Sequence, residues 1–404
     1  MKNNMKSVQT LFSILLVVLF SNISLGQKQT LFVAKDFDSV MKQAKLEKKP
    51  VVLMFYASWC VHCNVMKNDV FNKENVVNFY NQNYICIASD IESSEGKLLR
   101  EKLKSQLIVK SYPTFVYFDF NGTITNAIAG EFKPEKFIEE GTNNLNEDFH
   151  FKNVKSSFEN NTADYDKSFA YILMAKRIGF NPTEIAERYL KTVAPNDYYT
   201  EKNWRLIANG ILDFDSPVFL DLIKNRAEFE KVVSKTRVDK KINFVINENF
   251  STYILESNTI KYTKNRSIAA DFKLREIDSL LFFKDLNFYE HNNKWNEYHA
   301  VLTQNIDKFS LNDAQFINSV AANYYMFIDD KKMLESAIDW QRKAIELNPS
   351  LDKYVLLSNL ALKSKNYKQG IEYASQGIEF GKNLGFNTSE IEQILEQLQA
   401  KNKK

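Results

Sequence analysis

Two cysteines separated by two residues, Cys60 and Cys63, are the side chains of this sequence best suited to chemistry. They follow an apolar run over 51–56 and precede a helical pattern. A helix N-terminus carries partial positive charge and unpaired N–H groups, so it stabilises a thiolate. We therefore expect Cys60 to be the nucleophile in dithiol–disulfide exchange. Cys63, one helical turn later, is expected to resolve the mixed disulfide that Cys60 forms.

His62 lies between the two cysteines. A cationic or hydrogen-bonding imidazole near Cys60 would stabilise the thiolate further and make the disulfide more oxidising. The alternative is an exposed histidine without a role.

Other interpretations of the cysteines depend on what lies around them. A zinc site needs about four ligands, and no second Cys/His pair accompanies Cys60, His62 and Cys63. A metal site is therefore disfavoured, and no cofactor is predicted. Cys86 lies between isoleucines in a strand pattern, so we expect an inert buried thiol. A third redox cysteine is the alternative for Cys86.

Strand and helix patterns alternate along the region that surrounds the dithiol. Asn121-Gly122 lies between two strand patterns, which is a strong hairpin signal. Pro134 stands where the first turn of a helix would begin. We expect strands at 30–34, 51–56, 84–88, 114–120 and 123–129, and helices at 36–48, from Cys60 onward, at 75–83, 94–105 and 134–145.

This element order and two motifs resemble the thioredoxin superfamily, in particular its secreted members that are fused to helical modules. The motifs are FYASWCVHC, over 55–63, and SYPTF, over 111–115. The resemblance spans about 30–146 and implies an α/β domain with a central mixed sheet flanked by helices. It also implies that Pro113 is cis and faces the dithiol. A simple turn proline is the alternative.

Further expectations concern residues near the motifs. Trp59 is expected to cover the disulfide face, and the Tyr112 backbone to lie where an extended substrate peptide could pair. Pro113 is expected to keep a metal away from the dithiol. In the family, a histidine at the place of His62 is typical of oxidising and isomerising members. Reducing members commonly bury an aspartate where this sequence has Met54, so fast thioredoxin-like reduction is in doubt.

The N-terminal residues resemble a secretory signal peptide over 1–26. Lys2 and Lys6 precede an apolar run over 11–20, and small residues precede an expected cleavage near Gly26/Gln27. An uncleaved membrane anchor is the alternative, although spanning a bilayer takes about 20 apolar residues. The expected location is extracytoplasmic, in a bacterium the periplasm, where disulfide exchange is routine.

Beyond the thioredoxin-like region, expected at 27–148, helical patterns replace strands. The region 149–310 is expected to be α-solenoid-like. Residues 311–404 resemble tetratricopeptide repeats, because two units lie about one 34-residue period apart, with Ala337 answering to Gly370. The predicted fold is thus a thioredoxin-like α/β domain followed by an all-α repeat region.

Composition limits the partners. The 404 residues include 53 basic and 50 acidic side chains, and this balance gives no electrostatic reason to expect nucleic acid.

The predicted function is an extracytoplasmic thiol–disulfide oxidoreductase that acts on protein thiols and disulfides. It would need a redox recycling partner, not identified by the sequence, and its helical part would dock a protein partner. The alternative is a non-catalytic scaffold built on the helical repeats. The redox direction stays open.

Overall fold

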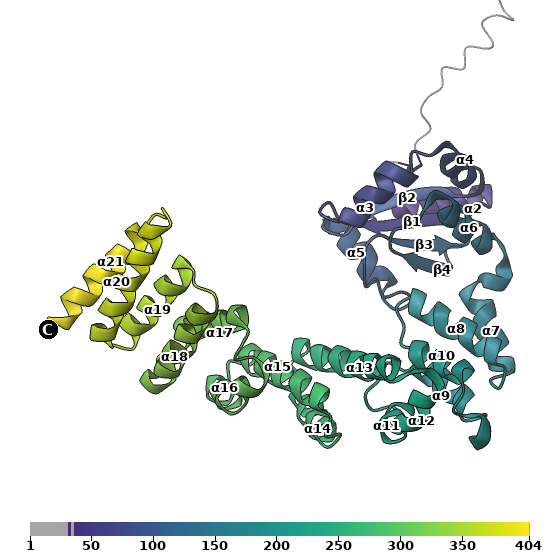
Figure 1. The fold of residues 1–404 in the computed structure, drawn as a ribbon. Helices are drawn as coiled ribbons and strands as arrows, with labels where there is room; N and C mark the ends of the chain where they lie inside the picture. The colour runs from purple at the N-terminus through teal and green to yellow at the C-terminus, as the bar shows by residue number, and fades with distance from the viewer. Residues whose placement is uncertain (1–30, 34–35, 404) are drawn as a thin grey trace, which may run out of the picture. The chain divides into compact units, whose positions relative to one another are not determined.

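The computed structural model describes residues 31–33 and 36–403 (Figure 1). The chain divides into two compact units, 1–238 and 239–404, and each is described by itself. The predicted signal peptide over 1–26 lies outside the described residues. The domain limits expected at 148/149 and 310/311 stay predictions.

A four-stranded mixed sheet lies at the centre of the N-terminal part (Figure 1). Its strand order is β2-β1-β3-β4, with β1 parallel to β2 and antiparallel to β3, and β3 antiparallel to β4. The strands are β1 (Val51–Tyr56), β2 (Ile85–Asp90), β3 (Thr114–Phe118) and β4 (Ile124–Ala129). The continuous apolar run of β1 is explained by its position, because a central strand is covered on both faces.

Helices cover both faces of this sheet. Val52 and Met54 of β1 point to a core shared with α3, η1, α4 and α6, whereas Leu53 and Phe55 point to a core shared with α2 and α5. The predicted α/β architecture is confirmed. The helices are α2 (Phe37–Glu47), α3 (Val61–Val65), the π-helical turn η1 (Met66–Val70), α4 (Glu74–Asn83), α5 (Ser94–Leu103) and α6 (Pro134–Leu145).

One expected element differs. Of the strand predicted at 30–34, the structure describes Leu31, Phe32 and Val33, and these residues are not part of the sheet. The Val33 N–H nevertheless donates to the Cys86 carbonyl at 2.9 Å. Within the described residues 31–33, one backbone bond to β2 does not make a strand ladder, although the sequence there is β-like. The predicted hairpin is present, with Gly122 at φ +90° in its turn.

The rest of the first unit is helical, and its first helices extend the core of the sheet. Ile178, at the end of α8, is buried in the core that contains Leu53 and Phe55. The elements are η2 (Glu147–Phe149), α7 (Phe151–Asn160), α8 (Tyr165–Arg177), α9 (Thr183–Leu190), η3 (Pro195–Asp197), α10 (Glu201–Gly210), α11 (Pro217–Lys224) and α12 (Arg226–Val233), followed by α13 (Lys235–Leu255), which crosses into the second unit.

Successive helices of the second unit pack against one another. Gly370 and Gly377 of α20 let this helix approach α19 and α21, since a Cβ at either position would meet side chains of both neighbours. The predicted all-helical region is confirmed, whereas its assignment to tetratricopeptide repeats stays a prediction. The helices are α14 (Thr259–Ala270), α15 (Arg275–His291), α16 (Trp295–Phe309), α17 (Ala314–Phe327), α18 (Lys331–Leu347), α19 (Leu351–Lys363), α20 (Tyr367–Asn383) and α21 (Ser389–Asn402).

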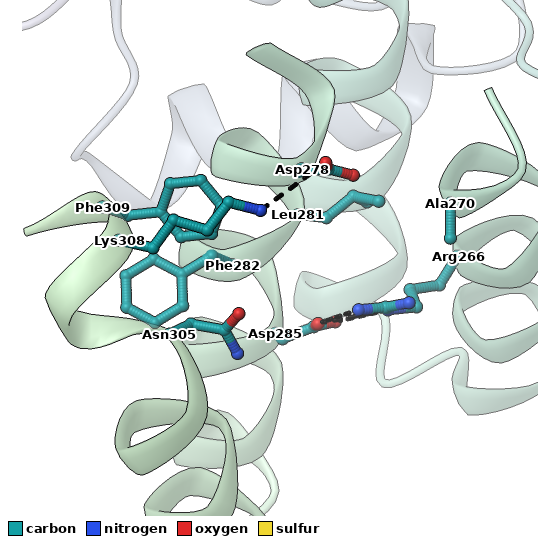
Figure 2. A pocket seen from close by; sticks show the side chains of 9 residues that line it. All are labelled: Arg266, Ala270, Asp278, Leu281, Phe282, Asp285, Asn305, Lys308 and Phe309. Atoms are coloured by element: carbon teal, nitrogen blue, oxygen red, sulfur yellow. Dashed lines mark hydrogen bonds and ion pairs between the residues drawn. The ribbon is translucent and has the colours of Figure 1, made fainter. Parts of the chain in front are cut away.

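Two ion pairs join α14, α15 and α16 around a small pocket of about 240 Å³ (Figure 2). Arg266 of α14 donates from Nη2 to Oδ2 of Asp285 at 2.8 Å, and the Tyr262 hydroxyl donates to Oδ1 at 2.7 Å. Asp285 is buried, so its charge depends on these donors. Lys308 and Asp278 form a longer pair of 3.9 Å at the rim.

We predict that Arg266→Met lowers the free energy of unfolding by about 2–3 kcal/mol, because it leaves the buried Asp285 carboxylate without its countercharge. The matched control is Lys331→Met, which removes an exposed ion pair to Glu335 and should cost no more than about 1 kcal/mol. Urea unfolding of both variants measures the difference. Equal costs would contradict a structural role for the buried pair.

Candidate active site

The dithiol lies at the start of the helix that follows the central strand. Cys60 is the N-cap residue of α3, with φ −75° and ψ 110°, and Cys63 lies one turn into the helix. The two cysteines form a disulfide with their Cα atoms 5.2 Å apart. The Cys63 N–H points at Cys60 Sγ, 3.2 Å away. A reduced Cys60 would therefore hold its sulfur against a helix N-terminal amide, which favours the thiolate.

The second motif contacts the first through two aromatic rings. The Tyr112–Pro113 peptide is cis, as the resemblance implied. The Tyr112 ring meets the Trp59 ring edge to face, with centroids 6.3 Å apart, and its hydroxyl accepts from Arg100 at 3.1 Å. Pro113 is buried directly before β3. The structure thus brings the loop before Cys60 and the loop before β3 together, although the motifs are about fifty residues apart in sequence.

Glu92, which the sequence analysis did not identify, holds the residues that lead into the dithiol. Its carboxylate accepts from Trp59 Nε1 and from the Ser58 hydroxyl, each at 3.0 Å. Trp59 itself is 64% exposed, whereas Cys60 is 5% exposed. A lone glutamate after a strand gives no sequence signal. Only the parallel pairing of β1 and β2 shows that it lies beside Trp59.

The loop that carries Glu92 depends on a glycine. Gly96 lies in the first turn of α5, and a Cβ there would collide with the carbonyl oxygen of Asp90. Asp90 in turn accepts from the Glu92 N–H through Oδ1 at 2.9 Å. The close approach of helix and loop therefore fixes the position of the Glu92 backbone.

His62 is exposed and has a carboxylate partner. Its Nδ1 lies 3.0 Å from Oε2 of Glu131, in the loop between β4 and α6. Glu131 is the second residue that sequence reasoning missed, since it follows His62 by 69 positions without a motif of its own. The pair places one carboxylate beside the residue between the cysteines.

The Cys63 side of the disulfide is apolar. Met54 is buried and pairs with Ala88 across β1 and β2. Both line a cavity of about 720 Å³ that Cys63 also lines, and none of the described residues that line it is a carboxylate. The remaining lining residues are Leu31, Phe32, Tyr56, Ala57, Ser58, Asn64, Lys67, Phe71, Asn72 and Val77.

Cys86 is a free, buried thiol in β2, on the same face of the sheet as Met54. Burial raises the pKa of this thiol far above its ordinary value, an effect that Lys49 only partly offsets. Such a thiol is a poor nucleophile. These features fit the interpretation of Cys86 as a core residue.

The described residues contain no group of three or more His, Cys, Asp and Glu side chains placed to hold a metal ion. The other histidines bond elsewhere. His150 Nε2 lies 2.9 Å from the Asn144 carbonyl oxygen, and His299 Nδ1 lies 2.8 Å from the Tyr324 hydroxyl. None of these contacts involves Cys60 or Cys63.

Comparison with known proteins identifies the domain that carries this site. Residues 37–142 match the family model described as a thioredoxin-like domain. No match was found among curated proteins. The chain therefore contains a thioredoxin-like domain, as the two motifs predicted, and a long helical region beyond it.

Several solved structures are similar to part of the chain. A structure titled DsbH oxidoreductase is 18% identical, with a TM-score of 0.26, and the match covers 30% of this chain and 88% of that one. A putative disulphide-isomerase from Bacteroides thetaiotaomicron is 21% identical, with a TM-score of 0.26 and coverage of 29% and 94%. The oxidised C-terminal domain of Neisseria meningitidis DsbD is 28% identical, with a TM-score of 0.23 and coverage of 26% and 91%.

We predict that a thiol reagent added to the reduced, folded chain modifies Cys60 rapidly and Cys86 only after unfolding. The raised pKa keeps the Cys86 thiol protonated even at pH 9, whereas an unperturbed cysteine, with a pKa of about 8.5, would be largely ionised there. Mass spectrometry of the alkylated chain with time measures this difference. Modification of Cys86 at the rate of Cys60 in the folded chain would contradict the prediction.

Proposed function

We propose that this protein is an extracytoplasmic thiol–disulfide oxidoreductase that exchanges disulfides with protein substrates through Cys60 and Cys63. The observation that carries the proposal is the Cys60–Cys63 disulfide at the N-terminus of α3, inside a thioredoxin-like domain. A helix N-terminus that points an amide at one sulfur is suited to a nucleophilic thiolate. Nothing in the composition favours another chemistry at this place.

In the reducing direction the reaction has two exchanges. The Cys60 thiolate attacks one sulfur of a substrate disulfide, and the other substrate sulfur leaves as a thiolate that takes up a proton. Cys63 then loses its proton and attacks Cys60 Sγ in the mixed disulfide. The substrate leaves as a dithiol, and the protein holds the Cys60–Cys63 disulfide, so the substrate has gained the two electrons that the protein lost. The oxidising direction is the reverse.

Removal of the proton from Cys63 is the step in which this site differs from the reducing members of the family. Its cavity has no carboxylate among the described lining residues, and Met54 occupies the place of their buried acid. The departing substrate thiolate or water must therefore accept the proton. This requirement supports a role in oxidation or isomerisation over fast reduction, and so does His62 between the cysteines.

The substrate face would be formed by Trp59, Tyr112 and Pro113. The exposed indole of Trp59 and the half-buried ring of Tyr112 meet beside the cysteine pair. The peptide that binds there would run along the backbone before Pro113. A redox recycling partner must return the dithiol to its starting state, and the helical region would dock that partner or the substrate.

The location is supported by the sequence of the first 26 residues and by the chemistry. Among the described residues, no helix has the length and the apolar character needed to cross a membrane. Disulfide exchange on proteins is a routine need outside the cytoplasm. The intact mass of the exported chain should equal that of a chain that begins at Gln27. A chain retained in the cytoplasm would overturn this part of the proposal.

We predict that Cys60→Ser abolishes both insulin-disulfide reduction and oxidation of a dithiol peptide. Cys63→Ala keeps the nucleophile but cannot resolve the intermediate, so it should accumulate a mixed disulfide with substrate, visible as added mass that dithiothreitol removes. Cys86→Ala is the matched control and should retain activity. Turnover that does not depend on Cys60, or no turnover in either direction, would favour the non-catalytic scaffold.

We also predict that His62→Pro makes the Cys60–Cys63 reduction potential more negative by about 30 mV or more, a tenfold change in the equilibrium. The imidazole near Cys60 stabilises the reduced thiolate, and proline removes it. Position 62 lies in the first turn of α3, where proline is tolerated. Equilibration with glutathione measures the potential.

Glu131→Gln supplies the control for this effect. If Glu131 acts through the imidazole, the substitution changes the potential in the chain with His62 and leaves it unchanged in the His62→Pro background. An equal shift in both backgrounds would show that the carboxylate acts on the dithiol directly.

A further inference from the structure

A cavity of about 720 Å³ opens beside Cys63, and the exchange chemistry described above places no ligand in it. Its size lies within the range of small-molecule sites, about 300–1,000 Å³. Its inner wall is apolar and mostly buried, formed by Met54, Phe71, Val77 and Ala88 together with Cys63. The cavity is thus large enough and apolar enough to take more than a water molecule.

The arrangement of strands explains why this space is apolar. Met54 and Ala88 pair across β1 and β2, and their side chains reach the same face of the sheet. Met54 is uncharged and flexible and Ala88 is small, so the two side chains leave space in the cavity and bring no charge to it. Phe32 and Leu31 add further apolar lining. Such a wall gains free energy when apolar surface replaces water in it.

The polar groups of the cavity are at its mouth. Asn64, Lys67 and Asn72 are exposed, whereas the apolar lining residues are mostly buried. Lys67 is the one charged residue among the described lining residues, and it forms no ion pair within the described part of the chain. A ligand of this cavity would therefore have an apolar body and one anionic end, because a cationic or second charged group would meet no partner.

We propose that this cavity binds a single-chain amphiphile with an anionic head, a medium-chain carboxylate, with the chain against Met54 and Ala88 and the head at Lys67. A bound chain would lie over Cys63 and shield its sulfur from solvent. Binding itself does not require the redox activity. Its effect on Cys63 during exchange rests on the proposed function.

The first test is calorimetric titration of the full mature chain with dodecanoate below its micelle concentration. We expect saturable binding at one site. Dodecyltrimethylammonium has the same chain with a cationic head and should bind at least tenfold more weakly. Titration with phosphatidylglycerol vesicles shows whether the protein binds an anionic membrane surface and not a free, monomeric ligand. Binding to vesicles with no binding of monomeric dodecanoate would overturn the proposal, and so would equal affinity for both head groups.

Three variants locate the site. Ala88→Phe fills the apolar end and should weaken dodecanoate binding at least tenfold. Lys67→Gln changes only an exposed side chain and should weaken it about three- to fivefold, the range of an exposed ion pair. Lys73→Gln is the matched control, an exposed lysine outside the lining, and should stay within twofold of the unmodified chain. Unchanged affinity in the first two variants would overturn the assignment.

A second measurement reports on Cys63 and is independent of turnover. In Cys60→Ser the Cys63 thiol is free, and its alkylation by iodoacetamide can be followed by mass spectrometry. Saturating dodecanoate should slow this reaction at least fivefold, and Lys67→Gln should shift the protection to higher ligand concentration. Calorimetric binding without protection of Cys63 would place the ligand elsewhere and overturn the proposal. Loss of oxidoreductase activity in other assays would leave this result unaffected.

Discussion

The position of β1 between a parallel and an antiparallel neighbour is the constraint on which the site depends. Its last residue, Tyr56, pairs with Asp90 of β2, and the residue before it pairs with Thr114 of β3. The chain that leaves β1 therefore passes between the end of β2 and the start of β3. For this reason Trp59 meets both Glu92, which follows β2, and Tyr112, which precedes β3. The register of one strand thus assembles three separate loops around Cys60.

The two cysteines have different surroundings as a result. Cys60 caps α3, and His62 in the first turn of that helix is paired with Glu131, so charged and polar groups gather on its side. Cys63 faces an apolar cavity. A thiolate is favoured at the helix N-terminus and disfavoured against an apolar wall. This asymmetry supports the roles proposed for Cys60 as nucleophile and Cys63 as resolving thiol, and it places Cys63 on the wall of the cavity proposed to bind a ligand.

The sequence identified the strands, helices and cysteines of this domain because these depend on local signals. The apolar run of β1, the Asn121-Gly122 turn and Pro134 at the start of α6 each act within a few residues. Glu92 and Glu131 carry no such signal, because their partners are distant in sequence and only the fold brings them near. The strand expected at 30–34 shows the converse limit. A β-like composition does not determine whether a neighbouring strand is available to pair with the segment.

The change from strands to helices after residue 146 is visible in the sequence, but the hydrophobic core of the sheet continues into the helical region. Ile178 of the helical region is buried among residues of the sheet, and its carbonyl accepts from the Ile108 N–H at 2.9 Å. Gly179, at φ +83°, permits this contact, since a Cβ there would collide with the Ile108 backbone. Ile108 belongs to the segment that leads into Tyr112 and Pro113. The first helices therefore brace the chain that enters the cis-proline loop, and they contribute to the site from outside the domain that the motifs define.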